Sequence, residues 1–385
     1  MEKQMTRIST NPAFFKKAFP VIFLIAFSIA HSFSESVDVK GEKYNLTVSY
    51  NKFSLPGDAV FVRVNLETSD KYLKDSPVAT SGKIQIFEGD TELFESTSFD
   101  AGSAKDLGHA DFYRISESSV SVDVDAEQTD VKEKKSFRRK KQKNLVQPLQ
   151  TKKETILAGI PLSSYFKTGE HTIIVTLKPF GDTKRQITLP LMINNKEFVK
   201  ETIQLDAKNT SIRTNDSDER WRQIKKLNGI LGTTNYDAVY DLGPYDAPTP
   251  ATRRTSFFAD RRIYAYNNGK SATSLHYGID YGIKEGSEVR ACASGKVVLA
   301  ETRLTTGWSV VIEHLPGLYS LYYHNSVLKV NVGDIVKKGD LIAYSGKTGL
   351  ATGAHLHWEM RLNMEAVRPD FFLGDFTFDT HSESR

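Results

Sequence analysis

The sequence predicts a mostly β protein that contains two folded units, an immunoglobulin-like β-sandwich followed by a compact antiparallel β domain. The chain has 385 residues, more than one average domain. Two regions, 35–205 and 254–373, contain short segments in which apolar and polar residues alternate between turn signals. No stretch of the second region has a convincing helical period.

Residues 1–34 have the pattern of a secretory signal. Positively charged residues precede the apolar run "AFPVIFLIAFSIA" (18–30), and small or polar residues follow it. This run is shorter than the roughly 20 residues that a membrane-spanning helix requires. We therefore expect export to the periplasm or cell envelope, with cleavage near Ser32 to Ser34. The alternative is an uncleaved signal that anchors the protein in the membrane.

Residues 35–205 predict the immunoglobulin-like sandwich. Their alternating segments include "KYNLTVSY", "AVFVRVNLE", "GKIQIFEG", "HTIIVTLKP" and "RQITLPLMI". The two histidines of this region, His109 and His171, stand alone in the sequence. Because no catalytic residue types gather here, this unit is interpreted as a spacer or a binding module.

A charged insertion interrupts the predicted sandwich around 104–152. Its basic run "KEKKSFRRKKQK" (132–143) follows an acidic stretch, and blocks of like charge are usually solvated and mobile. If this run has a partner, a membrane surface or an anionic wall polymer would suit its charge. The formal net charge of the chain is only +4, whereas a nucleic-acid-binding protein usually has a stronger and clustered excess. No nucleic-acid partner is therefore predicted.

Residues 206–253 form a predicted linker with a short helix. The segment "DSDERWRQIKKLNGILG" has Ser217 or Asp218 as a candidate N-cap and Gly232 near its end. Residues 374–385 are predicted to be a tail. The single cysteine, Cys292, excludes an intrachain disulfide and is interpreted as a small buried side chain.

Histidine and aspartate gather in the second unit at spacings that suit a metal site. His276 and Asp280 are four residues apart, and His355 and His357 are two apart, so each pair would share one face of an extended strand. His324 ends the predicted strand "LYSLYYH". Catalytic Zn²⁺ takes three protein ligands, which can be imidazole nitrogens and carboxylate oxygens, and keeps a fourth position for water. The spacing alone does not assign ligands among these five residues.

Residues 254–373 resemble the M23 metallopeptidase family, the lysostaphin-like or LytM-type cell-wall endopeptidases. The resemblance rests on "HYGIDYG", "GSEVRACASGKVV", "VVIEH", "YYHNS" and "VNVGDIVKKGDLIAYSGKTGLATGAHLHWEMR". It implies a hybrid-barrel type of antiparallel β domain with one Zn²⁺, bound by His276, Asp280 and His357. It also implies catalytic roles for His324 and His355, and peptidoglycan stem or cross-bridge peptides as substrates.

The chemistry of amide hydrolysis is consistent with this resemblance. Zinc acidifies a water molecule and polarises a carbonyl, and imidazoles can carry the protons because no HExxH glutamate is present. Glu359 is a candidate partner of a metal-binding histidine. Tyr264 or Tyr266 could help to stabilise an oxyanion, and His314 is interpreted as structural.

Three alternative functions compete with that of an active peptidase. A catalytically silent M23-like domain could activate a partner cell-wall hydrolase, but such domains typically lose ligands, and all five positions are filled here. A biotinyl- or lipoyl-carrier domain would require a modifiable lysine in a tight turn, which is absent. An adhesin whose sandwich is the functional part could coexist with the peptidase. The sequence therefore predicts an exported zinc endopeptidase.

Overall fold

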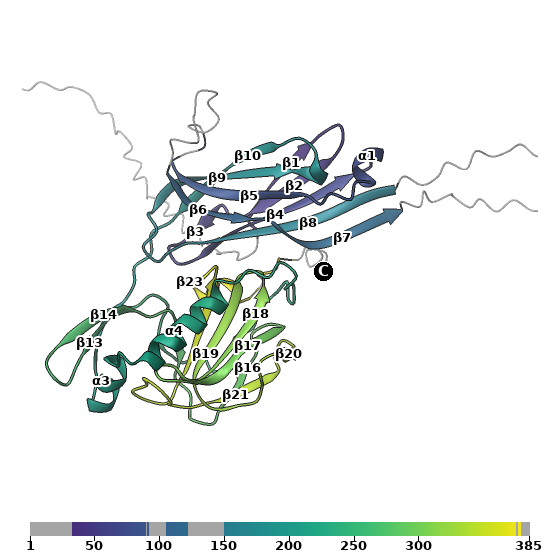
Figure 1. The fold of residues 1–385 in the computed structure, drawn as a ribbon. Helices are drawn as coiled ribbons and strands as arrows, with labels where there is room; N and C mark the ends of the chain where they lie inside the picture. The colour runs from purple at the N-terminus through teal and green to yellow at the C-terminus, as the bar shows by residue number, and fades with distance from the viewer. Residues whose placement is uncertain (1–32, 90, 92–104, 122–149, 375, 379–385) are drawn as a thin grey trace, which may run out of the picture.

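The computed structural model describes residues 33–89, 91, 105–121, 150–374 and 376–378. Within these residues the chain is mostly β and its sheets are largely antiparallel, so the predicted fold class is confirmed. The sandwich is stacked on the C-terminal domain (Figure 1). No helix among the described residues is both long enough and apolar enough to span a membrane. Nearly all of the predicted signal and the whole basic run 132–143 lie outside the described residues.

The N-terminal unit consists of two five-stranded sheets that enclose one apolar core. In sheet order, the first contains β1 (Glu35–Lys40), β2 (Asn45–Tyr50), β4 (Ala59–Thr68), β8 (Gln150–Pro161) and β7 (Tyr113–Ser121). The second contains β3 (Phe53–Ser54), β10 (Arg185–Ile193), β9 (Gly169–Lys178), β5 (Ser81–Glu88) and β6 (Asp106–Asp111). The short helix α1 (Lys71–Lys74) and a 3₁₀ turn (Pro179–Gly181) connect strands. This is a β-sandwich, and its immunoglobulin-like type stays a prediction.

The predicted limits of the charged insertion, 104–152, are wrong at both ends. Strands β6 and β7 lie inside this range, and β8 begins at Gln150. The reason is that apolar side chains of this stretch are still buried: Leu107 packs against the sandwich core, and Tyr113 packs against the cluster that is shared with the C-terminal domain. The intervening residues 122–149 lie outside the described part of the chain.

A third, small sheet connects the two units. Strand β11 (Lys200–Gln204) falls within the range predicted for the sandwich, but it pairs in parallel with β13 (Arg261–Ala265), which pairs with β14 (Ser271–Leu275). Two helices follow β11, α3 (Ala207–Arg213) and α4 (Asp218–Leu231).

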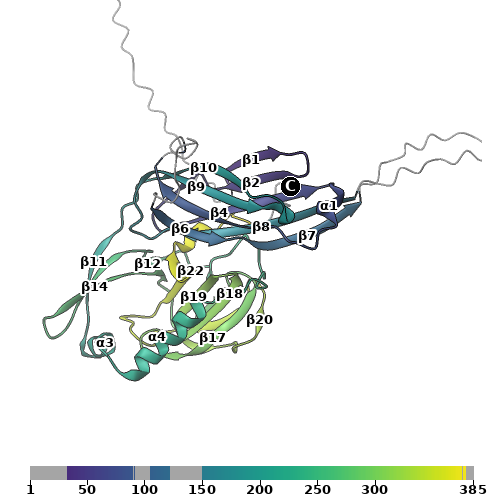
Figure 2. The ribbon, with the colours of Figure 1, turned by 45° about the horizontal axis from the view of Figure 1, so that its top comes forward.

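Helix α4 begins and ends where its capping pattern predicts. The Ser217 hydroxyl accepts the backbone N–H of Arg220, and the helix stops at Gly232. Figure 2 shows α4 lying along the strands of the C-terminal domain, and Leu231 packs there beside Leu299 and Tyr319. Helix α3 was not predicted from the sequence, because seven residues give too short an apolar pattern.

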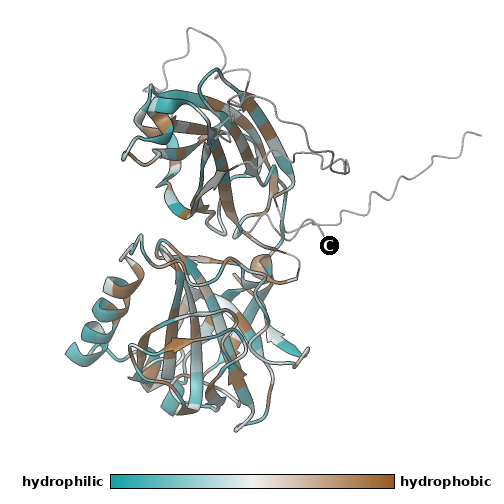
Figure 3. Cartoon of the chain, turned by 90° about the vertical axis from the view of Figure 1, so that its right-hand side faces the viewer, coloured by the Kyte–Doolittle hydropathy of each residue, from teal (hydrophilic) through white to brown (hydrophobic). Residues whose placement is uncertain are grey.

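The C-terminal domain is built on a ten-stranded antiparallel sheet. Its main path contains β12 (Arg254–Ser256), β15 (Gly278–Tyr281), β22 (Leu356–Leu362), β19 (Leu318–Leu328), β18 (Gly307–Leu315), β17 (Gly295–Arg303) and β20 (Ile335–Val336). Three further strands join it, β16 (Glu288–Arg290), β21 (Leu341–Ser345) and β23 (Glu365–Val367), and a 3₁₀ turn (Pro369–Phe372) follows. Hydrophobic residues recur along the strands of both units (Figure 3).

An aromatic cluster joins the two units. Phe61 on β4 is fully buried, and its ring lies 4.7 Å from that of Phe378 and 6.2 Å from that of Phe376, between ring centroids. The Arg368 guanidinium also donates to Asp58 of the sandwich at 2.7 Å. The predicted tail 374–385 is therefore wrong for its first residues, because burying two phenylalanines stabilises their attachment to the core.

Candidate metal centre

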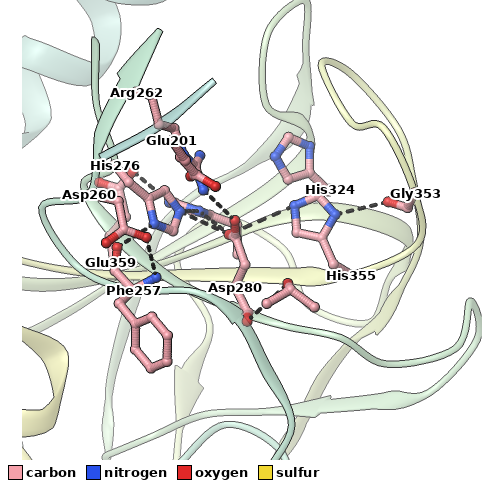
Figure 4. A network of polar contacts seen from close by, with 12 residues as sticks. Glu201, Phe257, Asp260, Arg262, His276, Asp280, His324, Gly353, His355 and Glu359 are labelled. Carbon is pink, nitrogen blue, oxygen red and sulfur yellow. Dashed lines mark hydrogen bonds and ion pairs between the residues drawn. The ribbon is translucent and has the colours of Figure 1, made fainter. Parts of the chain in front are cut away.

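Three side chains converge on one point of the C-terminal domain. Asp280 Oδ1 lies 3.0 Å from His276 Nε2 and 2.7 Å from His357 Nδ1, and the two nitrogens are 2.9 Å apart (Figure 4). All three residues are buried. Among the described residues, they form the one cluster of His, Cys, Asp and Glu side chains whose arrangement could hold a metal ion.

Strand pairing places two of these three side chains together. Asp280 on β15 lies directly opposite His357 on β22, so both side chains point to the same face of the sheet. The prediction that His276 shares a strand with Asp280 is wrong, because β15 begins only at Gly278. His276 lies in the connection from β14, where its backbone N–H donates to Asp260 O and its carbonyl accepts from Ala259 N.

The remaining nitrogens of both imidazoles are fixed by protein acceptors. His276 Nδ1–H donates to Phe257 O at 2.8 Å, and His357 Nε2–H donates to Glu359 Oε1 at 2.9 Å. Glu359 in turn accepts from Arg361 at 2.8 Å, so the partner role predicted for Glu359 agrees with its contacts. These bonds leave His276 Nε2 and His357 Nδ1 as lone-pair donors toward the centre.

The electrostatics of the cluster favour a cation between its members. Burial opposes ionisation of Asp280, but its contacts with His276 and His357 hold its pKa well below the usual value. Burial also opposes a charged His357, yet Asp280 and Glu359 raise its pKa to about 9. Converging lone pairs therefore require a positive charge, which a proton or a metal ion can supply.

An arginine from the small third sheet binds the second oxygen of the aspartate. The buried Arg262 on β13 donates to Asp280 Oδ2 at 3.0 Å and to Glu201 Oε1 at 2.6 Å. Glu201 and Arg262 are register partners across β11 and β13. Sequence reasoning missed this pair, because Glu201 and Asp280 lie 79 positions apart and no spacing connects them. The contact leaves Oδ1 free to face the metal position.

A second pair of imidazoles lies beside the three-residue cluster. The rings of His324 and His355 are 4.7 Å apart between centroids, and His355 Nε2 is 3.8 Å from Asp280 Oδ1. His324 Nδ1–H donates to Thr348 O at 2.7 Å, and His355 Nδ1–H donates to Gly353 O at 2.9 Å. Each Nε2 is therefore free to accept a proton. Burial, with the neighbouring imidazoles, lowers the pKa of His324 to about 3, so this ring is neutral.

A bulge turns His324 toward the centre. The prediction that the strand ends at this residue is wrong, since β19 continues to Leu328. The preceding residue, Tyr323, is the register partner of His357, and in a regular strand His324 would face the opposite side. The pairing of β18 with β19 shifts register here, and His324 has φ of 62°, which redirects its side chain.

All five residues line one groove of about 590 Å³. The small third sheet forms one part of its wall, and residues 350–354 of the loop before β22 form another. Tyr264 lines this groove, as its proposed role requires, whereas Tyr266 is not among the lining residues.

The segment that contains these five residues is similar to known proteins. The model of peptidase family M23 matches residues 274–369, which include all five convergent residues. Over 95 residues the chain is 40% identical to the DD-carboxypeptidase/endopeptidase Mpg of Neisseria meningitidis serogroup B, covering 25% of this chain and 22% of that protein.

Residues 274–369 form a domain of peptidase family M23.

Two further relatives extend the comparison of the M23 domain. The murein hydrolase activator EnvC of Escherichia coli K12 is 40% identical over 97 residues, 25% of this chain and 23% of that protein. The crystallised catalytic domain of lysostaphin from Staphylococcus simulans is 31% identical, with 34% of this chain and 89% of that chain covered and a TM-score of 0.24. The matched segment spans about a fifth of the length of the curated relatives.

The other histidine of the M23 domain has a structural environment. His314 is fully buried, and its nitrogens contact Ser294 O at 2.8 Å and Ser320 Oγ at 2.7 Å. Burial lowers its pKa to about 4. The adjacent Cys292 is also fully buried, and burial raises the pKa of its thiol to about 12, so it acts as a small core side chain.

We predict that replacing Arg262 weakens metal binding. Arg262→Met would leave Asp280 Oδ2 without its donor, and losses of outer partners typically reduce metal affinity by about 10–100-fold. Competition titration against a chromophoric zinc chelator would measure the change. Arg261→Met is the control on the same strand, since Arg261 instead contacts Ser164. Equal zinc affinities of the Arg262 variant and the wild type would contradict this role.

We predict that His314 makes the stability of the protein pH-dependent. Its folded-state pKa of about 4 lies below the ordinary 6.5, so the unfolded state takes up the proton first. The stabilisation is fully present above pH 6.5 and is lost as pH falls toward 4, by on the order of 3 kcal/mol. Denaturant unfolding across this range should show a steeper loss for the wild type than for His314→Gln. If the unfolding free energies of the two proteins fell equally with pH, His314 would not be the source of the pH dependence.

Proposed function

We propose that this protein is a zinc-dependent endopeptidase that hydrolyses peptide bonds in the stem or cross-bridge peptides of bacterial peptidoglycan. The observation that carries the proposal is the position of two imidazoles, with free Nε2 atoms, beside a convergent His276–Asp280–His357 cluster. The relatives named as an endopeptidase and as lysostaphin support the reaction class.

Zinc is the metal that best suits the donor set. Two imidazole nitrogens and one carboxylate oxygen are typical of catalytic zinc sites that keep an open position. The ligands would be His276 through Nε2, Asp280 through Oδ1 and His357 through Nδ1. When bound, zinc polarises a scissile carbonyl and lowers the pKa of a water toward about 7.

The two other imidazoles would carry the protons of the reaction. Hydrolysis of an amide requires a base that takes a proton from the attacking water and an acid that gives one to the leaving amine. His355 Nε2 faces Asp280 and has its other nitrogen occupied by Gly353 O. His324 is held neutral by burial, with its Nδ1–H on Thr348 O. Its Nε2 can therefore accept a proton, and it can donate a hydrogen bond only in the protonated form. We assign the acid–base work to this pair.

An M23 domain can also have a non-catalytic function. The similarity to an activator of murein hydrolases supports a second candidate, a silent domain that activates a partner hydrolase. The complete set of five side chains favours the enzyme, because a purely structural domain gains nothing from burying three converging lone pairs. The proposed substrate lies outside the cytoplasm, which agrees with the export signal proposed for residues 1–34.

Digestion of purified peptidoglycan tests the proposal directly. The protein should release soluble muropeptides that mass analysis identifies as products of peptide-bond cleavage. A chelator should abolish release and added zinc should restore it. Release that persists after complete chelation would contradict a metal-dependent reaction. A protein that binds no zinc and releases nothing, but stimulates another hydrolase, would support the activator.

Two substitutions test the division of roles. His357→Ala removes a proposed ligand and should abolish both zinc binding and turnover. His355→Ala should reduce turnover by about 10²–10⁴-fold, the usual contribution of a general acid or base, and keep most of the zinc. Metal analysis after dialysis and muropeptide release measure the two effects. If both variants lost zinc equally, the assignment of His355 would be wrong.

A further inference from the structure

The groove extends beyond the metal centre along the small third sheet. Arg262 and Tyr264 are two positions apart on β13, so both side chains lie on the face that lines the groove. Arg262 contacts Asp280, and Tyr264 lies about 7 Å further along the strand, given the rise of about 3.3 Å per residue. A substrate that leaves the metal centre along this wall therefore meets Tyr264.

Helix α3 bridges the two walls at this part of the groove. The Asn209 side chain donates to Ala351 O, at 3.5 Å, in the loop that precedes His355. On the other wall, Asn267 N–H donates to Thr210 Oγ1, at 3.3 Å, beside the β13–β14 turn. Asn209 and Thr210 are both buried. Figures 1 and 2 show α3 next to the β13–β14 hairpin.

Arg213, in the last turn of α3, faces this part of the groove. Its Cζ lies 5.2 Å from the centroid of the Tyr264 ring, and its side chain is among those that line the groove. Its Nε is buried without a hydrogen-bond partner, and no carboxylate of the described residues forms an ion pair with it. A guanidinium held on an aromatic ring is oriented, and the Nε–H of this one has no acceptor within the described part of the chain.

The charges of the groove leave this cation uncompensated. Each carboxylate that lines the groove already has a partner: Glu201 accepts from Arg262, Asp280 from Arg262, and Glu359 from Arg361. Arg253 also lines the groove without an ion pair in the described residues, but it is exposed to water and stacks on no aromatic ring. Arg213 is therefore the groove cation that is preorganised for an anion from outside the chain.

We propose that Arg213, stacked on Tyr264, binds a carboxylate of the substrate peptide. The inference rests on the proposed function and adds a substrate requirement. Arginine presents paired donors that match a carboxylate. The path from Asp280 past Arg262 and Tyr264 is on the order of 10 Å, which corresponds to about three extended residues. The recognised carboxylate therefore lies about three residues from the scissile bond.

Two sources of that carboxylate have the same chemistry. Helix α3 bridges both walls and so closes the groove at this position. An α-carboxylate fits there because it ends the peptide, and no further residues have to pass α3. A side-chain carboxylate would also fit. Three forms of one cleavable synthetic stem peptide separate these sources: the free acid, its C-terminal amide, and the form with its side-chain carboxylate amidated.

The test compares kcat/KM of the zinc-loaded protein on these three peptides. The wild type should lose about tenfold or more on the form that lacks the recognised carboxylate, the usual effect of a hydrogen bond to a charged group. Arg213→Met should cleave the free acid as slowly as the wild type cleaves that amide, and should no longer discriminate. Arg213→Lys should recover part of the difference.

A control and a binding measurement separate this inference from the proposed function. Arg222→Met is the control, since Arg222 on α4 pairs with Glu219 and does not line the groove; it should discriminate as the wild type does. Calorimetric titration of the three peptides into metal-free wild-type protein should rank their affinities in the same order as their kcat/KM values. Discrimination retained by Arg213→Met, or absent from the wild type in both assays, overturns the carboxylate site. Failure of the proposed function alone would abolish cleavage of every peptide but leave the binding order intact.

Discussion

The register of three neighbouring strands is the constraint on which the site depends. Asp280 on β15, His357 on β22 and Tyr323 on β19 are consecutive cross-strand partners. A slip of one residue would turn each side chain to the opposite face and disperse the proposed metal ligands. Gly278 contributes to this register, because a Cβ at its position would lie 2.2 Å from Trp358 O. Only glycine permits that approach of β15 to β22.

Hydrogen-bond and ion-pair partners from separate parts of the chain offset the desolvation free energy of this many buried polar groups. The carboxylate of Asp280 receives Arg262 from the third sheet, and His276 is bound by the Phe257 carbonyl. The sheet of β11, β13 and β14 is thus part of the site, although β11 comes directly after the sandwich in the chain. Because an unpartnered buried charge is strongly destabilising, assembly of the centre depends on docking of this sheet.

The sequence indicated that His276, Asp280 and His357 would come together, and the family resemblance proposed them as ligands, but neither indicated the Glu201–Arg262 pair that supports Asp280. Even spacing on strands brings His355 and His357 to one face, and Glu359 follows by the same rule. The Glu201–Arg262 pair arises from a parallel register between strands that are distant in the chain, and no local pattern encodes such a register. The bulge at His324 was missed for a related reason. A positive φ at a histidine results from the tertiary contacts around it, and the side-chain alternation of the strand gives no sign of it.

The proposed catalytic residues and the proposed carboxylate-binding arginine come from different segments of the chain. The segment matched by the family model, 274–369, contains the five convergent residues. Helix α3 and most of the wall formed by the third sheet come from residues 201–264, which precede that segment. Arg262 and Phe257 also precede that segment, and they hold Asp280 and His276. The other preceding residues can therefore alter the length, closure and charge of the groove without a change at the metal centre. The contacts of α3 with both walls fix the distance between the metal position and the end of the groove. A change in the length or position of α3 would therefore change the length of peptide that the groove accepts.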